Sequence, residues 1–153
     1  MVTVSRSEEL AEFAREGRRR FALGDEEWFA QTTAHGAVSS FGTAPEEQSR
    51  GREDVLALTT DQVREMNEAA GLDIAVPDED DQDVIEAYQA GDAGWIVTHG
   101  RFVFEDGSWA LNRVVNVLVR DPDGSGWKSV CTASQLLVPN DMLEPGSPLR
   151  SSA

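Results

Sequence analysis

The sequence has little or none of several features that mark common classes of protein. Cys131 is the only cysteine among 153 residues, so no disulfide can form within the chain and a Cys-x-x-Cys motif is absent. No apolar run reaches the roughly 18 residues that a transmembrane helix needs, and the start of the chain lacks the apolar core of a signal peptide. We therefore expect a cytoplasmic protein that is neither exported nor embedded in a membrane.

Positive charge is also scarce. The chain has 13 Lys and Arg residues against 28 Asp and Glu, which gives a formal net charge of −15. A protein with this charge repels nucleic acid and anionic lipid. The one basic cluster, at Arg15, Arg18, Arg19 and Arg20, is interpreted as a solvated or ion-paired helix face. We expect no nucleic-acid partner and no membrane partner.

Motifs for metals, nucleotides and serine nucleophiles are missing. Phosphate-binding glycine motifs and the Gly-x-Ser-x-Gly context of serine hydrolases are absent. The acidic run at residues 77–83 has neither the central glycine nor the ligand spacing of a calcium loop. The two histidines, His35 and His99, match no zinc-ligand spacing. The sequence therefore predicts neither a metal site nor a cofactor.

Three long β-type runs dominate the second half of the chain. They cover residues 94–104, 109–120 and 127–138 and are separated by connections rich in Gly and Asp, which is typical of consecutive antiparallel strands. A shorter run at residues 84–90 leads into them. We predict a meander of three long strands with a fourth strand beside it.

Helical periodicity marks the first half. Apolar residues predict a helix that begins at a capping box of Ser5 and Glu8 and ends near Gly24. Asp25 is a suitable cap for a short second helix, and a third helix is predicted over residues 52–71. The other expected segments are strands at 37–41 and 72–76 and a loop at 42–51.

This order of elements predicts an α+β fold. A helical hairpin and a third helix would pack on one face of a curved antiparallel sheet. The length suits one domain over residues 1–140. Residues 141–153 are rich in Pro, Gly and Ser and are expected to form a loosely ordered tail.

Short motifs along the chain resemble those of a known superfamily. They are Phe41-Gly42-Thr43-x-Pro45-x-Glu47, Gly51, Gly91-Asp92-x-Gly94-Trp95, Asp106-Gly107, Arg113, Gly126-Trp127-Lys128 and Val138-Pro139-Asn140. In this order they resemble the SnoaL-like branch of the nuclear transport factor two-like superfamily, whose cone-shaped fold is shared with ketosteroid isomerase, scytalone dehydratase and limonene epoxide hydrolase. The resemblance implies this fold, but the superfamily includes isomerases, dehydratases, hydrolases, cyclases and non-catalytic binding domains.

The sequence departs from the family pattern where relatives carry polar pocket residues. The resemblance implies a His and a Ser on the last strand, and Ala133 and Gln135 stand there instead. Ala44 replaces an Asp, and Gln48 and Ser49 replace an aromatic pair. These departures favour binding over catalysis and leave open whether any reaction is catalysed.

Three residues are candidates for acid–base chemistry. His99 lies in a predicted strand and His35 near the expected cavity mouth, and imidazole titrates near neutral pH. Glu86 shares a strand face with Tyr88, where a carboxyl and a phenol could form a proton-transfer pair. The alternatives are hydrogen-bonded structural histidines and side chains that point outward from the sheet edge.

Large apolar side chains and a few polar ones are the candidates for ligand binding. They are Trp28, Phe41, Tyr88, Trp95, Phe102, Arg113, Trp127 and Cys131. Arg113 lies within the most apolar strand and should bind a carboxylate of the protein or a ligand anion. Asn112 and Asn116 share the opposite strand face. Which face lines a cavity is left open by the sequence.

Three classes of function remain. The first is a protein that binds an apolar small molecule in an apolar pocket, with or without catalysis. The second is a cofactor-independent acid–base enzyme of the cyclase, isomerase or dehydratase type, and the third is a dimerisation or assembly domain. A homodimer is expected because apolar residues occupy both faces of the strand at residues 109–120. The identity of the ligand is not predicted.

Overall fold

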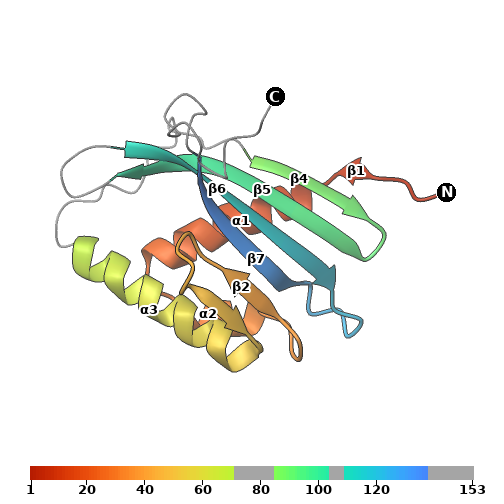
Figure 1. The fold of residues 1–153 in the computed structure, drawn as a ribbon. Helices are drawn as coiled ribbons and strands as arrows, with labels where there is room; N and C mark the ends of the chain where they lie inside the picture. Colours follow the sequence, from red (N-terminus) through yellow and green to blue (C-terminus); the bar gives the residue numbers. More distant parts are fainter. Residues whose placement is uncertain (71–84, 104–108, 138–153) are drawn as a thin grey trace.

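The part of the chain that the structure describes forms three helices and seven strands (Figure 1). The computed structural model describes residues 1–70, 85–103 and 109–137, and within these the side chains at 65–70, 101–103 and 109–110 are not described. The elements are β1 (Ser5–Arg6), α1 (Glu8–Ala22), α2 (Glu26–Thr32), β2 (Ser39–Phe41), β3 (Gln48–Arg50), α3 (Arg52–Ala70), β4 (Ile85–Ala90), β5 (Ala93–Val103), β6 (Trp109–Arg120) and β7 (Trp127–Leu137).

The first helix starts two residues later than predicted. Ser7, not Ser5, is the N-cap, and its side chain accepts a hydrogen bond from the Leu10 N–H at 3.3 Å. Ser5 instead belongs to β1, where it pairs with Gln89 at the edge of the sheet. The long-range pairing of β1 with β4 places Ser5 in the sheet, which a prediction from local spacing did not take into account.

The other two helices agree with the sequence prediction. Asp25 caps α2 by accepting a hydrogen bond from the Trp28 N–H at 3.0 Å. Helix α3 follows Gly51, whose φ of +87° favours glycine. No helix in the part of the chain that the structure describes is long and apolar enough to cross a membrane.

The strands form one mixed sheet in the order β1-β4-β5-β6-β7-β2-β3. The predicted meander of β5, β6 and β7 is confirmed. The predicted curved antiparallel sheet is confirmed except in one pairing, because β2 runs parallel to β7. Residues 48–50, expected in a loop, form β3 by pairing with β2. The predicted segments at 72–76, 77–83, 105–108 and 141–153 lie outside the described residues.

The helices lie on one side of the curved sheet (Figure 1). We call this helix-facing side the concave face and the opposite side the convex face. The core forms where Leu10 of α1 meets Ile96, Leu118 and Trp127 of the sheet, and both leucines are fully buried. The α+β plan, with helices on one face of a curved sheet, is therefore confirmed.

Candidate functional site

Strand register assigns each side chain to a face of the sheet. Ile96 and Leu118 pack against α1, so every second residue along their strands shares the concave face. Thr98 is two residues after Ile96 and therefore shares its face, and it pairs with Val114 of β6. Asn116 pairs with Ile96 and therefore faces the same way.

A bulge in β7 shifts the phase of that strand. Ser129 and Cys131 pair with consecutive residues of β6, which leaves Val130 without a partner there. As a result, Ser129 and Thr132 face the same side although they are three positions apart, a spacing that would place them on opposite faces of a regular strand. The Ser129 Oγ donates to Asn116 Oδ1 at 2.6 Å, and the Thr132 Oγ1 is 3.5 Å from the same atom.

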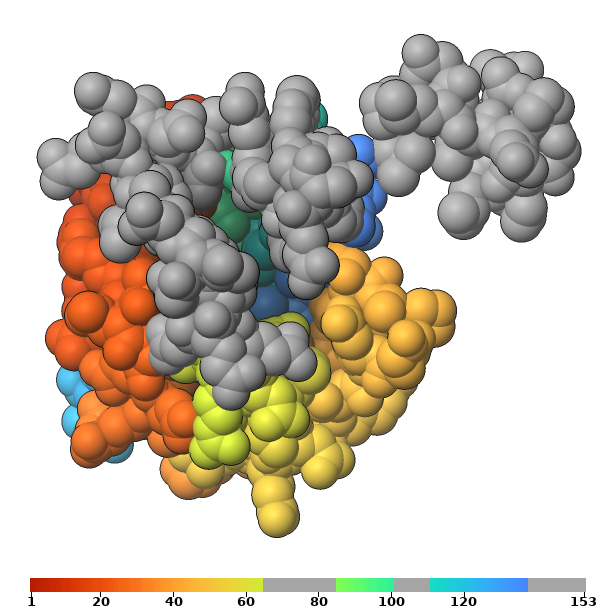
Figure 2. Space-filling view, turned by 90° about the vertical axis from the view of Figure 1, so that its left-hand side faces the viewer, coloured from red at the N-terminus to blue at the C-terminus, as the bar shows by residue number. Residues whose placement is uncertain are grey.

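The concave face is packed at one end and open at the other. Under α1, Ile96 and Leu118 are buried, at 3% and 0% exposed. Further along the same strands the side chains are only half-buried, although they lie in the middle of the sheet. Figure 2 shows a hollow there, with the green to blue strands at its bottom and α1, α3 and the β2–β3 region around it. This open half comprises Thr98, Asn112, Val114, Asn116, Thr132, Ser134 and Leu136.

The open half is neutral and able to form hydrogen bonds. Its side chains are amides, hydroxyls and aliphatic groups, and none of them carries a charge. The Oδ1 of Asn112 is buried and has no hydrogen-bond partner, a situation that costs about 1–3 kcal/mol. No cluster of three or more metal-binding side chains exists among the described residues.

The three acid–base candidates lie in separate places. His99 is on the convex face, where its Nε2 accepts a hydrogen bond from Arg113 Nε at 3.0 Å. Among the described residues, Arg113 therefore binds an imidazole and no carboxylate, and the alternative of a ligand anion stays a prediction. Glu86 is also on the convex face, on β4. His35 is exposed beside a separate cavity of about 310 Å³ near the β6–β7 loop.

Several predicted ligand-binding residues share the convex face. Tyr88 and Trp95 pack together there with ring centroids 5.8 Å apart. Cys131 lies on this face as well, because it pairs with Val117 of β6. Phe41 pairs with Ala133, so it has the same orientation. These side chains do not line the hollow on the concave side.

The remaining candidates on the helix side mostly pack within the protein. Trp127 is 4% exposed in the core, with the Arg120 guanidinium 4.4 Å above its ring. Trp28 packs against Phe13, at 5.3 Å between ring centroids. The side chain of Phe102 lies outside the described residues. The aromatic candidates for ligand binding whose side chains are described are thus divided between the core, the convex face and helix contacts. Their role in binding stays a prediction.

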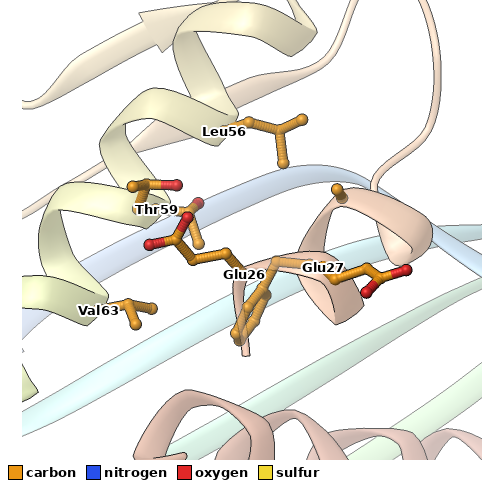
Figure 3. Close-up of a pocket in the computed structure, with 8 residues that line it drawn as sticks. Glu26, Glu27, Leu56, Thr59 and Val63 are labelled. Carbon is orange, nitrogen blue, oxygen red and sulfur yellow. The ribbon is translucent and has the colours of Figure 1, made fainter. Parts of the chain in front are cut away.

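A groove that is separate from the hollow runs between α2 and α3 (Figure 3). It has a volume of about 380 Å³ and contains none of the predicted site residues. Figure 3 shows Glu26 reaching toward Thr59 across the groove, whereas Glu27 points away from α3. Glu26 also meets Arg64 at 3.5 Å. The residues around it are Glu26, Glu27, Phe29, Ala30, Leu56, Thr59, Thr60 and Val63.

The basic cluster on α1 is ion-paired, as the sequence indicated. Arg15 and Arg19 both bind Glu12, at 3.0 Å and 2.7 Å. Hydrogen bonds from Arg19 and Arg15 lower the pKa of Glu12 below its ordinary value. Arg20 bridges Glu16 and Asp25. These three arginines are therefore paired with Glu12 and Glu16 of α1 and with Asp25, the N-cap of α2.

Sequence reasoning missed part of the open half. Thr98, Thr132 and Ser134 were not among the predicted site residues, whereas Asn112 and Asn116 were noted for sharing a face. The polar face of β6 could be recognised from the sequence, because Asn112 and Asn116 lie on the same face of an otherwise apolar strand. For β7 the period-two pattern fails at the bulge, so the grouping of Ser129 with Thr132 was hidden.

Comparisons with known proteins show what this arrangement is similar to. No protein-family model matches the sequence, and no curated protein matches it. Solved structures do match. One is a cystatin-like fold protein from Burkholderia xenovorans, with a TM-score of 0.61 and 18% identity, covering 91% of this chain and 99% of that one.

Two further structures are described as nuclear transport factor two-like (NTF2-like). A candidate dehydratase from Streptomyces avermitilis has a TM-score of 0.62 and 16% identity, covering 86% of this chain and 96% of that one. An NTF2-like protein with a cystatin-like fold from Novosphingobium aromaticivorans has a TM-score of 0.58 and 16% identity, covering 85% of this chain and 80% of that one.

These similarities show the fold. The chain has the cystatin-like fold that these NTF2-like proteins also have. The resemblance inferred from the short sequence motifs is confirmed at this level. Because the identities are low, the similarity concerns the fold, and the more specific SnoaL-like assignment stays a prediction.

Proposed function

We propose that this protein binds a small uncharged molecule in the hollow above the open half. The observation that supports this most is that the described residues cover the concave face incompletely. Central strands under a helical layer normally bury their inward side chains, yet Thr98, Val114 and Ser134 remain half-buried. A concave site with a few polar groups around apolar ones is the usual form of a small-molecule site.

Binding is favoured over acid–base catalysis by the composition of the open half. General acid–base catalysis needs a titratable group within reach of the substrate. The described side chains of the open half include none, and His99 and Glu86 face the other way. One structural neighbour is a candidate dehydratase, but a shared fold does not transfer a reaction. The enzyme alternative therefore has less support.

The proposal is tested by filling the hollow. Val114→Trp places a large ring at the centre of the open half, whereas Val117→Trp places it on the convex face of the same strand. A thermal-shift screen of uncharged ring compounds, together with native mass spectrometry of protein purified from its host, would detect a ligand. A ligand at one hundred times its Kd stabilises the fold by about 2.7 kcal/mol.

We expect Val114→Trp to abolish that stabilisation and Val117→Trp to keep it. Circular dichroism shows whether both variants fold. Equal loss of binding in the two folded variants would place the ligand elsewhere and contradict the proposal. So would a ligand that binds Val114→Trp as tightly as the unchanged protein.

We also propose that the convex face forms a homodimer. Val117 and Val119 are each 38% exposed there, and the apolar side chains of Trp95, Val97 and Val115 lie on the same face. None of the described helices covers this face (Figure 1). A contiguous apolar surface of this kind favours association. A pure assembly role would use this face and leave the hollow without a function.

A further inference from the structure

Val114 lies at the centre of the open half with polar groups around it. Thr98 of β5 and Ser134 of β7 are its direct partners across the sheet. Asn112 and Asn116 lie two positions away on either side along β6. The floor of the hollow is therefore an apolar centre with neutral hydrogen-bonding groups in four directions.

The spacing of these groups matches a small ring. Neighbouring strands are about 4.8 Å apart, so the Thr98 and Ser134 backbones are about 10 Å apart. Asn112 and Asn116 are four residues apart, or about 14 Å along the strand. A six-membered ring with substituents fits between such groups, and the remaining distance from the substituents to the polar side chains is that of a hydrogen bond.

Three of the four polar groups have unused hydrogen-bonding capacity. Thr98, Asn112 and Ser134 make no side-chain hydrogen bond to any described residue. The Asn112 Oδ1 is buried without a partner, and the inference below requires a turn about its broad χ2 torsion that would bring this acceptor toward the hollow. The site thus offers hydroxyls that both donate and accept, and an amide acceptor that needs a donor.

The fourth group is oriented by its neighbours. Because Ser129 donates to Asn116 Oδ1, the Nδ2 of Asn116 is the end left to donate to a ligand. Val114 and Leu136 contribute apolar area between the polar groups. No charged side chain of the open half could balance a ligand charge, and an unbalanced buried ion is costly.

Building on the proposed function, we infer that the ligand of this site is a neutral cyclic polyol. The apolar face of its ring lies on Val114. Its hydroxyl groups reach Thr98, Ser134 and the two asparagines at the edge. A hydroxyl is the substituent that matches this site, because it donates to Asn112 Oδ1 and accepts from Asn116 Nδ2 without carrying charge.

A series of six-membered rings tests this inference. The compounds are myo-inositol, cyclohexanol, cyclohexanecarboxylate and cyclohexylamine, which differ in hydroxyl number and charge on a common ring. Saturation-transfer NMR and titration calorimetry on the full chain measure their binding. We expect myo-inositol to bind more tightly than cyclohexanol, and both charged compounds to bind most weakly.

Two matched variants assign the recognition to Asn112. Asn112→Leu keeps the number and branching of the side-chain heavy atoms but removes the hydrogen bond, and we expect it to weaken myo-inositol binding at least tenfold. The affinity for cyclohexanol should stay the same or increase, which a merely unfolded or distorted site would not produce. The control is Gln135→Leu, an exposed amide on the convex face of β7, which should leave both affinities unchanged.

The outcomes separate this inference from the proposed function. If cyclohexanol binds the unchanged protein at least as tightly as myo-inositol, or if Asn112→Leu weakens both compounds equally, the polyol inference is overturned while small-molecule binding stands. The same holds if protein purified from its host carries a ligand that is not a polyol. If no ring compound binds and no ligand copurifies, both are overturned.

Discussion

Among single residues, Gly94 lies where Leu10 of α1 packs directly against the sheet backbone. A Cβ at this position would overlap the Leu10 Cδ1 and lie 2.9 Å from the Tyr88 carbonyl oxygen. Leu10 is fully buried, so it cannot move aside without disturbing the core. The absence of a side chain at Gly94 is therefore what allows α1 to seal the packed end of the concave face.

We expect Gly94→Ala to lower the free energy of unfolding by about 1–3 kcal/mol, the usual cost of overpacking. Urea denaturation followed by circular dichroism measures this change. In the double variant Leu10→Ala, Gly94→Ala, one of the two clashing groups is removed, so the combined loss should be smaller than the sum of the single losses. Strict additivity would show that the contact is not what limits this position.

At the scale of an element, α2 depends on its N-cap. The Asp25 carboxylate accepts a hydrogen bond from the Trp28 N–H at 3.0 Å and also binds Arg20 at 2.7 Å. The bond from the Trp28 N–H, followed by that from Arg20, lowers the pKa of Asp25. Because α2 carries Trp28 and Phe29 into contact with α1, the cap also stabilises the helical hairpin.

This lowered pKa predicts a pH dependence with a definite sign. The contribution of Asp25 is fully present above the unfolded-state value of about 3.9 and disappears as pH falls through the lower folded-state value. We expect Asp25→Ala to lower the melting temperature at neutral pH, and the difference from the unchanged protein to shrink in acid.

Asp25→Asn is the control, because asparagine is also a good N-cap but does not titrate. Its melting temperature relative to Asp25→Ala should keep the same advantage at every pH where the protein folds. A gap between Asp25→Ala and the unchanged protein that stays constant through the acid range would contradict the prediction.

For the molecule as a whole, the two faces of the sheet have different roles. On β6, Leu118 faces α1 and is fully buried, whereas Val117 and Val119 on the other face are 38% exposed. The concave side has a hollow with neutral polar groups, and the convex side has apolar groups without a helical cover (Figures 1 and 2). This division is the basis for proposing ligand binding on one side and dimerisation on the other.

The dimer proposal predicts sensitivity to charge on the convex face. Val117→Lys would bury an unpaired ammonium in the interface, which should raise the dimer dissociation constant at least tenfold, or by about 1.4 kcal/mol. Sedimentation equilibrium measures the change. Leu23→Lys is the control because Leu23 is 75% exposed at the end of α1, away from the sheet. A monomeric unchanged protein at micromolar concentration would contradict the proposal.

Local sequence signals predicted most of the elements. The long strands were recognised from β-branched runs bounded by Gly and Asp, and the Asp25 cap and the helix after Gly51 followed from local chemistry. These features depend on neighbours within a few residues, so the sequence contains the information directly. The fold class followed from their order. Ser5 and residues 48–50 were mispredicted because pairing with distant strands determines their structure.

Which side chains face the hollow was decided only by the tertiary structure. Period-two alternation grouped Asn112 with Asn116 and separated both from Arg113, but it could not say which group faces the helices. That choice depends on the contact between Leu10 and Leu118, which are more than 100 residues apart in the sequence. The β7 bulge and the parallel pairing of β2 with β7 likewise involve residues that are distant in the sequence. Local residues determine the helices and strands, whereas long-range packing determines the faces of the sheet and therefore the site.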